Sequence, residues 1–117
     1  MGKIIFYSYS ICSTCRKAAK WLDDQGLEYQ LIDIVKEPPL SKYINQAFDQ
    51  YPHDKKRIFN TRGKAFKSIN IDIFGLSREK IIQLLLSDGK LLKRPFLIFG
   101  EKIILGFNEA EYSNNLL

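Results

Sequence analysis

Apolar and polar positions along the first third of the chain predict a strand, a helix and a second strand. Residues 3–7 form an apolar run typical of a strand, and residues 13–25 carry apolar side chains at helical spacing before Gly26. Residues 29–35 form another run rich in Leu and Ile, which Pro38 closes. This connection predicts two parallel strands in one sheet.

The middle of the chain predicts helices. Apolar residues recur at helical spacing over residues 44–51, after two prolines and before Pro52. A second helix is predicted from Ser77 as N-cap to Gly89. Residues 58–73 carry mixed signals and predict only a short helix or turn. We therefore expect a helical insertion at about residues 40–90.

The last third predicts a hairpin and a short helix. Apolar runs at residues 96–99 and 103–105 are separated by a loop that begins with Gly100, and a loop of this length pairs strands antiparallel. Asn108, with Glu111 three residues later, predicts the start of a last helix. The order of elements is βαβ, then helices, then ββα, which predicts an α/β fold.

Two cysteines, Cys12 and Cys15, lie where the first strand meets the first helix. The free N–H groups and the dipole of a helix N-terminus favour a thiolate, so Cys12 is predicted to be a nucleophile. Cys15 lies one helical turn later and is predicted to resolve a mixed disulfide by closing an internal one. A CxxC at this junction is typical of a thioredoxin-like fold, here as a single domain over residues 1–117.

Other interpretations of the cysteine pair remain open. Free cysteines are often buried simply as small apolar side chains. A closed zinc site needs more ligands than Cys12, Cys15 and the single histidine, His53, provide, so we expect no metal.

Composition and charge narrow the class of protein. The chain has 117 residues, of which 45% are hydrophobic, enough for one core. It has neither a membrane-spanning run nor a secretory leader, so we expect a cytoplasmic protein without a membrane partner. The net charge is +5, and the whole excess lies in residues 54–67. Such a patch either attracts an oxyanion, an acidic protein or a nucleic acid, or is a solvated helix face. No nucleic-acid-binding motif accompanies it, so direct contact with nucleic acid is not expected.

Three segments, in this order and spacing, resemble the arsenate reductase family, which includes the Spx-type regulators. The resemblance covers nearly the whole chain, and the segments are Cys12-Ser13-Thr14-Cys15-Arg16-Lys17, Asn60-Thr61-Arg62 and Lys93-Arg94-Pro95-Phe96. It implies that Cys12 is the nucleophile and that Arg62 and Arg94 bind an oxyanion or stabilise the Cys12 thiolate. In the thioredoxin-like fold, it also makes Pro95 a candidate cis proline that faces the nucleophile.

The resemblance further implies partners. In the reductase branch, an external thiol restores the cysteine, so we expect a glutaredoxin, a thioredoxin or a low-molecular-weight thiol as reductant and no bound cofactor. Ser8 stands where those enzymes have a histidine, and their third arginine has no counterpart near the last strand, which argues against arsenate as the substrate.

The second cysteine is similar to the Spx branch, whose members switch by disulfide formation and bind the C-terminal domain of the RNA polymerase α subunit. The glycine that those regulators use at the polymerase surface has no counterpart between Gln50 and Asn60. We therefore expect a thiol–disulfide redox protein. A redox-switched regulator that binds the RNA polymerase α subunit is the alternative, and a family member with inactive cysteines is a third.

Overall fold

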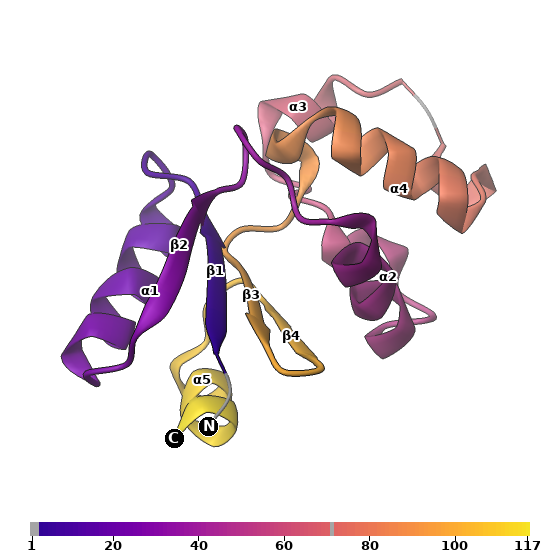
Figure 1. Cartoon of the computed structure of the whole chain (residues 1–117). Helices are drawn as coiled ribbons and strands as arrows, with labels where there is room; N and C mark the ends of the chain where they lie inside the picture. The colour runs from indigo at the N-terminus through magenta and orange to yellow at the C-terminus, as the bar shows by residue number, and fades with distance from the viewer. Residues whose placement is uncertain (1–2, 71) are drawn as a thin grey trace.

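A mixed four-stranded sheet lies at the centre of the computed structural model (Figure 1). The strand order is β2-β1-β3-β4; β1 pairs in parallel with β2 and antiparallel with β3, and β3 pairs antiparallel with β4. The strand bounds are β1 Ile4–Ser8, β2 Tyr29–Asp33, β3 Phe96–Phe99 and β4 Lys102–Leu105. The structure describes residues 3–70 and 72–117. The predicted domain includes residues 1–2 and 71, and the predicted helical insertion includes residue 71; at these positions both predictions lie outside the described residues.

Helices cover both faces of this sheet. On one face lie α1 Ser13–Asp24 and α5 Glu109–Leu116. The other face is covered by the elements between β2 and β3, which are α2 Ser41–Gln50, η1 Lys55–Ile58, α3 Lys64–Lys67, η2 Ile73–Gly75, α4 Arg78–Ser87 and η3 Gly89–Leu91. The observed order of strands and long helices is the one that the sequence predicts.

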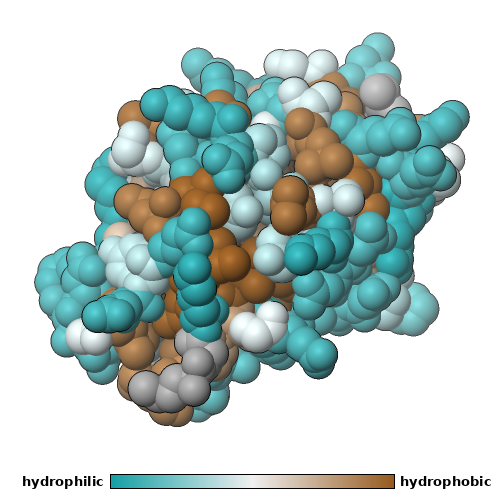
Figure 2. Space-filling view, in the orientation of Figure 1, coloured by the Kyte–Doolittle hydropathy of each residue, from teal (hydrophilic) through white to brown (hydrophobic). Residues whose placement is uncertain are grey.

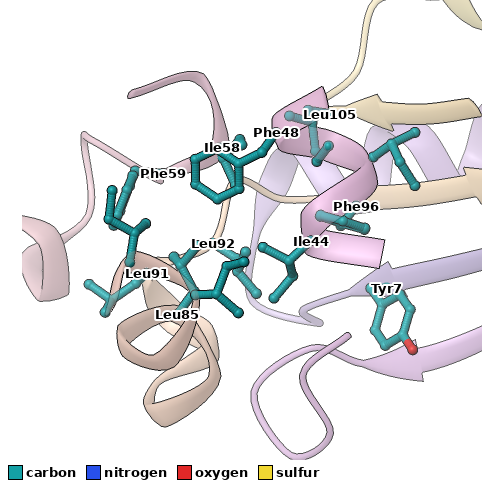
Figure 3. Close-up of a cluster of buried hydrophobic side chains, with 14 of the residues drawn as sticks. Tyr7, Ile44, Phe48, Ile58, Phe59, Leu85, Leu91, Leu92, Phe96 and Leu105 are labelled. Atoms are coloured by element: carbon teal, nitrogen blue, oxygen red, sulfur yellow. The ribbon is translucent and has the colours of Figure 1, made fainter. Parts of the chain in front are cut away.

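Alternation along the strands divides the buried side chains into two clusters. Phe6 and Leu97 point toward α1 and α5. Tyr7 and Phe96 point to the opposite face, where their rings meet edge to face. Figure 3 shows the larger cluster on that side, which includes Ile44, Phe48, Ile58, Phe59, Leu85, Leu91, Leu92 and Leu105.

Several element boundaries differ from the prediction. The second strand ends at Asp33 rather than at residue 35, because the Asp33 carboxylate accepts hydrogen bonds from the N–H groups of Val35 and Lys36 and closes a turn. Helix α2 begins at residue 41, before the first apolar position of the pattern. The last strand begins at Lys102, so the hairpin loop is shorter than predicted, and Gly100 adopts a φ of 61° there.

Gly89 does not end a helix as predicted. Helix α4 ends at Ser87, and the next residue, Asp88, accepts a hydrogen bond from the Lys90 N–H with its side chain and caps the start of η3. Gly89 instead packs against the backbone after β2, where any Cβ would collide with the Ile34 carbonyl. A glycine is thus needed here for close approach.

On the face shown in Figure 2, hydrophobic residues gather near the middle, over the sheet, and hydrophilic residues surround them. Of the helices in residues 3–70 and 72–117, none has the length and apolar composition required to cross a lipid bilayer.

Candidate redox site

The two cysteines lie close together at the N-terminus of α1, on the loop that leaves β1. The Cys12 N–H donates to the Tyr9 carbonyl at 2.9 Å, which turns the chain, and Cys12 is the N-cap residue of the helix. Both cysteines are free thiols. Cys12 is half-buried, whereas Cys15 is 1% exposed, so a reagent in solution meets Cys12 first.

The surroundings of Cys12 favour its thiolate. Burial alone raises the pKa of the Cys12 thiol, but the backbone N–H and the thiol of Cys15, together with the Arg94 guanidinium, outweigh burial and lower this pKa below its ordinary value. Because Cys12 is the N-cap residue of α1, its sulfur also lies at the positive end of the helix dipole.

The surroundings of Cys15 have the opposite effect. Burial, and then the hydrogen bond and negative charge of Cys12, raise the pKa of Cys15 to about 11. Two donors partly oppose this rise: the Tyr9 N–H, which lies 3.4 Å from the Cys15 sulfur, and the Ser8 side chain. Near neutral pH, Cys15 therefore keeps its proton and can donate a hydrogen bond to Cys12.

Arg94 and Pro95 directly precede β3, and Arg94 reaches Cys12. The Arg94–Pro95 peptide bond is cis, as the sequence interpretation anticipated. The Arg94 guanidinium donates to the Lys90 carbonyl at 3.2 Å and lies 5.2 Å from the centre of the Tyr9 ring. These two contacts hold the positive charge beside Cys12.

Arg62 lies elsewhere, on the wall of an open cavity of about 780 Å³. This cavity extends to Thr14, between the two cysteines, but among the described residues Arg62 makes no hydrogen bond or ion pair with either of them. The structure thus brings Cys12, Cys15 and Arg94 together and places Arg62 on the wall of the adjoining cavity.

Two neighbours of the cysteines, Ser8 and Tyr9, were not identified as site residues from the sequence. Both act on Cys15 through donors, and the Tyr9 ring also contacts Arg94. Their position at the end of the first strand was the available signal, because residues there lie at the same end of the sheet as the helix N-terminus.

The arrangement suits thiol chemistry. An accessible thiol with a lowered pKa stands next to a buried thiol that can reach it, so a disulfide between them can form and be reduced. Within the part of the chain that the structure describes, His, Cys, Asp and Glu side chains do not gather in groups of three that could hold a metal ion.

Comparisons with known proteins identify the family of the chain. The sequence model of the ArsC family matches residues 7–115. A Bacillus subtilis protein named "Uncharacterized protein YusI" is 37% identical and covers 96% of this chain and 97% of its own length. The global transcriptional regulator Spx of Lactiplantibacillus plantarum is 32% identical over 92% of this chain and 82% of the regulator.

A solved structure gives the same result. The crystal structure described as a possible arsenate reductase from Streptococcus mutans is 34% identical in sequence and has a TM-score of 0.88. The match covers 99% of this chain and 100% of the Streptococcus mutans chain. Together with the strand order, these matches confirm the predicted α/β fold of thioredoxin-like type and the predicted family resemblance.

Proposed function

The chain belongs to the ArsC family, and from this membership we propose that it is a cytoplasmic thiol–disulfide oxidoreductase in which Cys12 is the nucleophile and Cys15 the resolving thiol. The observation that supports this most directly is that the two thiols differ in exposure and in pKa. The accessible Cys12 has a lowered pKa, whereas the pKa of the buried Cys15 is raised to about 11.

In the first step, the Cys12 thiolate attacks one sulfur of a disulfide or a small oxidant. With a disulfide, a bond forms between Cys12 and that sulfur, the original S–S bond breaks, and the departing thiolate takes a proton from water. Arg94 stabilises the Cys12 thiolate before the attack.

In the second step, Cys15 attacks Cys12 and expels the second half of the substrate as a thiolate. Once Cys12 is part of a mixed disulfide, its negative charge no longer raises the pKa of Cys15, while the Tyr9 and Ser8 donors still lower it. Cys15 therefore ionises more easily at the moment when it is needed. An external thiol, either a small molecule or a glutaredoxin or thioredoxin, then reduces the internal disulfide.

Arg62 completes the proposal as an anion-binding residue. It is exposed on the cavity that reaches Thr14, where its guanidinium can form paired hydrogen bonds with an oxyanion or carboxylate. We assign it to the binding of substrate rather than to the ionisation of Cys12.

Alkylation of single-cysteine variants tests the mechanism. In Cys15→Ser, the remaining Cys12 should react with iodoacetamide with a pH midpoint below about 8.5, the value of a free thiol, and should accumulate as a mixed disulfide with oxidised glutathione. In Cys12→Ser, Cys15 should react slowly at pH 7. An ordinary thiol midpoint for Cys12, measured by mass spectrometry of alkylated protein, would remove the basis of the proposal.

A second candidate function is that of a redox-switched regulator of transcription. It is supported by the relative named as a global transcriptional regulator and by the basic segment at residues 54–67. A column bearing the C-terminal domain of the RNA polymerase α subunit distinguishes the two. Retention that differs between oxidised and reduced protein, and does not differ for Cys12→Ser, would favour the regulator.

A further inference from the structure

We propose that the cavity beside the cysteine pair binds low-molecular-weight thiols whose non-reacting part carries several negative charges, phosphates in particular. This inference rests on the proposed thiol–disulfide function and names the class of small thiol that reduces the site. The starting observation is the position of the basic residues at 54–67, of which the redox mechanism uses only Arg62.

The positive charge of the protein is concentrated around this cavity. The excess of basic residues in the sequence lies at residues 54–67, and much of that segment lines the cavity. The basic lining residues are Lys56, Arg57, Arg62 and Lys93, whereas the acidic ones are Asp54 and Glu111. The walls therefore favour a ligand with more than one negative charge.

Two of these cations are held in place by the fold. The Arg57 guanidinium lies 4.5 Å from the centre of the Tyr51 ring. The Lys93 backbone N–H donates to the Ile58 carbonyl at 2.8 Å, and its side chain passes so close to Gly106 that a Cβ there would lie 3.1 Å from Lys93 Cε. Because these charges are partly fixed, a bound phosphate loses less side-chain entropy.

Two residues on the cavity wall connect it to the segments that carry the cysteines and Arg94. Thr14, on its wall, lies between Cys12 and Cys15 in the chain. Gly106, also on the wall, donates its N–H at 2.9 Å to the carbonyl of Pro95, which follows Arg94. A ligand in the cavity can therefore direct a thiol arm toward Cys12.

The size and lining suit a carrier larger than a simple thiol. The volume of about 780 Å³ lies in the range of small-molecule sites, roughly 300–1,000 Å³. Phe59 and Phe66, whose rings meet edge to face, provide an apolar part of the wall. Arginine in particular matches the paired oxygens of a phosphate.

The reaction at this site balances as two exchanges. The ligand thiolate attacks Cys12 in the Cys12–Cys15 disulfide, forming a mixed disulfide and releasing Cys15, which takes up a proton. A second ligand thiolate attacks the ligand sulfur of the mixed disulfide, so that a ligand disulfide leaves and Cys12 is released as a thiolate. Two electrons pass from two ligand thiols to the protein.

Coenzyme A and pantetheine provide a matched pair of probes, because they share one thiol arm and only coenzyme A carries the phosphorylated nucleotide. The measurement is the rate at which each reduces the oxidised full-length protein, followed by mass spectrometry, with glutathione and dithiothreitol as further thiols. We expect coenzyme A to react severalfold faster than pantetheine at low salt and to lose this advantage as salt rises. Adenosine 3′,5′-bisphosphate should slow coenzyme A but not pantetheine.

Charge variants locate the site. Arg57→Gln and Lys93→Gln should each lower the coenzyme A rate about twofold to fivefold, the range expected for partly exposed ion pairs, and leave the pantetheine rate unchanged. The control is Lys102→Gln, which also removes one positive charge but lies at the end of the sheet opposite the cavity. It should alter neither rate.

The outcomes separate this inference from the proposed function. Equal rates for coenzyme A and pantetheine, or a loss with Lys102→Gln equal to that with Lys93→Gln, would overturn the inference while dithiothreitol still reduces the protein. Failure of both probes would also overturn it. If no Cys12–Cys15 disulfide forms under oxidation at all, the proposed function itself fails.

Discussion

Arg94 reaches Cys12 because neighbouring groups hold its guanidinium on two sides. The Lys90 carbonyl accepts one N–H, and the Tyr9 ring packs against the guanidinium face. The guanidinium in turn lowers the pKa of Cys12, against the opposing effect of burial. Tyr9 is therefore a positioning residue, which acts on the nucleophile through Arg94.

Replacing Tyr9 tests this role. Tyr9→Leu removes the ring and should lower the rate of Cys12 alkylation at pH 7 about twofold to fivefold, because a contact between a cation and an aromatic ring contributes about 0.5–1 kcal/mol. The pH midpoint of alkylation should rise at the same time. Stopped-flow alkylation across pH 5–10 measures both.

The matched control is Tyr9→Phe, which keeps the ring and removes only the hydroxyl. It should retain the wild-type pH midpoint, and both variants keep the backbone N–H that contacts Cys15. If Tyr9→Leu and Tyr9→Phe shift the midpoint equally, the ring does not position Arg94.

At the scale of elements, the two edges of the sheet differ. The edge strand β4 is covered by α2, whose Gln50 side chain donates to the Ile103 carbonyl at 2.8 Å and accepts from the Ile103 N–H at 2.7 Å. One amide thus makes the pair of bonds that a neighbouring strand would make. At the other edge, β2 exposes Leu31.

Gln50 should therefore stabilise the packing of the helical segment against the sheet. Gln50→Leu leaves both Ile103 groups without their partner and should lower the free energy of unfolding by about 1–3 kcal/mol. Urea denaturation measures this loss. Gln46→Leu is the control, because Gln46 makes a single long bond of 3.4 Å to the Glu101 carbonyl, and it should cost less than about 0.5 kcal/mol. Equal losses would contradict a special role for Gln50.

The same elements explain how far the sequence could predict the fold. Strands and long helices were predictable because period-two and helical patterns are local, and N-caps such as Ser77 and Asn108 accept the expected backbone bonds. The bonds between Gln50 and Ile103 join residues 53 positions apart, and no local pattern indicates them. Gly89 was misassigned because close approach to Ile34 and a helix end both favour glycine.

The candidate site was predictable to a similar extent. Spacing and position indicated Cys12 and Cys15, and family resemblance indicated Arg94 and Pro95. The contribution of Ser8 and Tyr9 depends on how the end of β1 and the residue after it lie against Cys15, which is a tertiary property. The resemblance also indicated Arg62, which lines the adjoining cavity, and its role in binding an anion stays a prediction.

For the molecule as a whole, two buried acids of high pKa lie on one side of the sheet. Tyr112 donates its hydroxyl to the Gly106 carbonyl at 2.9 Å, and its pKa is raised by burial, then by the negative charges of Cys15 and Glu111. Cys15 itself has a pKa of about 11, chiefly because of burial. The folded protein therefore keeps two protons that the unfolded chain releases near pH 8.5 for cysteine and about 10 for tyrosine.

This difference predicts that the protein loses stability in alkaline solution. Groups whose pKa is raised on folding stabilise the protein fully below their unfolded pKa, and this contribution is lost as pH rises toward the folded value. The free energy of unfolding should therefore fall above about pH 9, by up to about 1.4 kcal/mol per pH unit for each retained proton. Cys12 has the opposite effect, because its lowered pKa adds stability as pH rises, and this contribution is complete above the unfolded pKa of the thiol.

Urea unfolding at pH 7–11 tests this prediction by comparing the protein with Tyr112→Phe. This variant should be about 1 kcal/mol less stable at pH 8, but its free energy of unfolding should decline less steeply above pH 10. Parallel curves for the two proteins would show that Tyr112 ionisation does not limit alkaline stability.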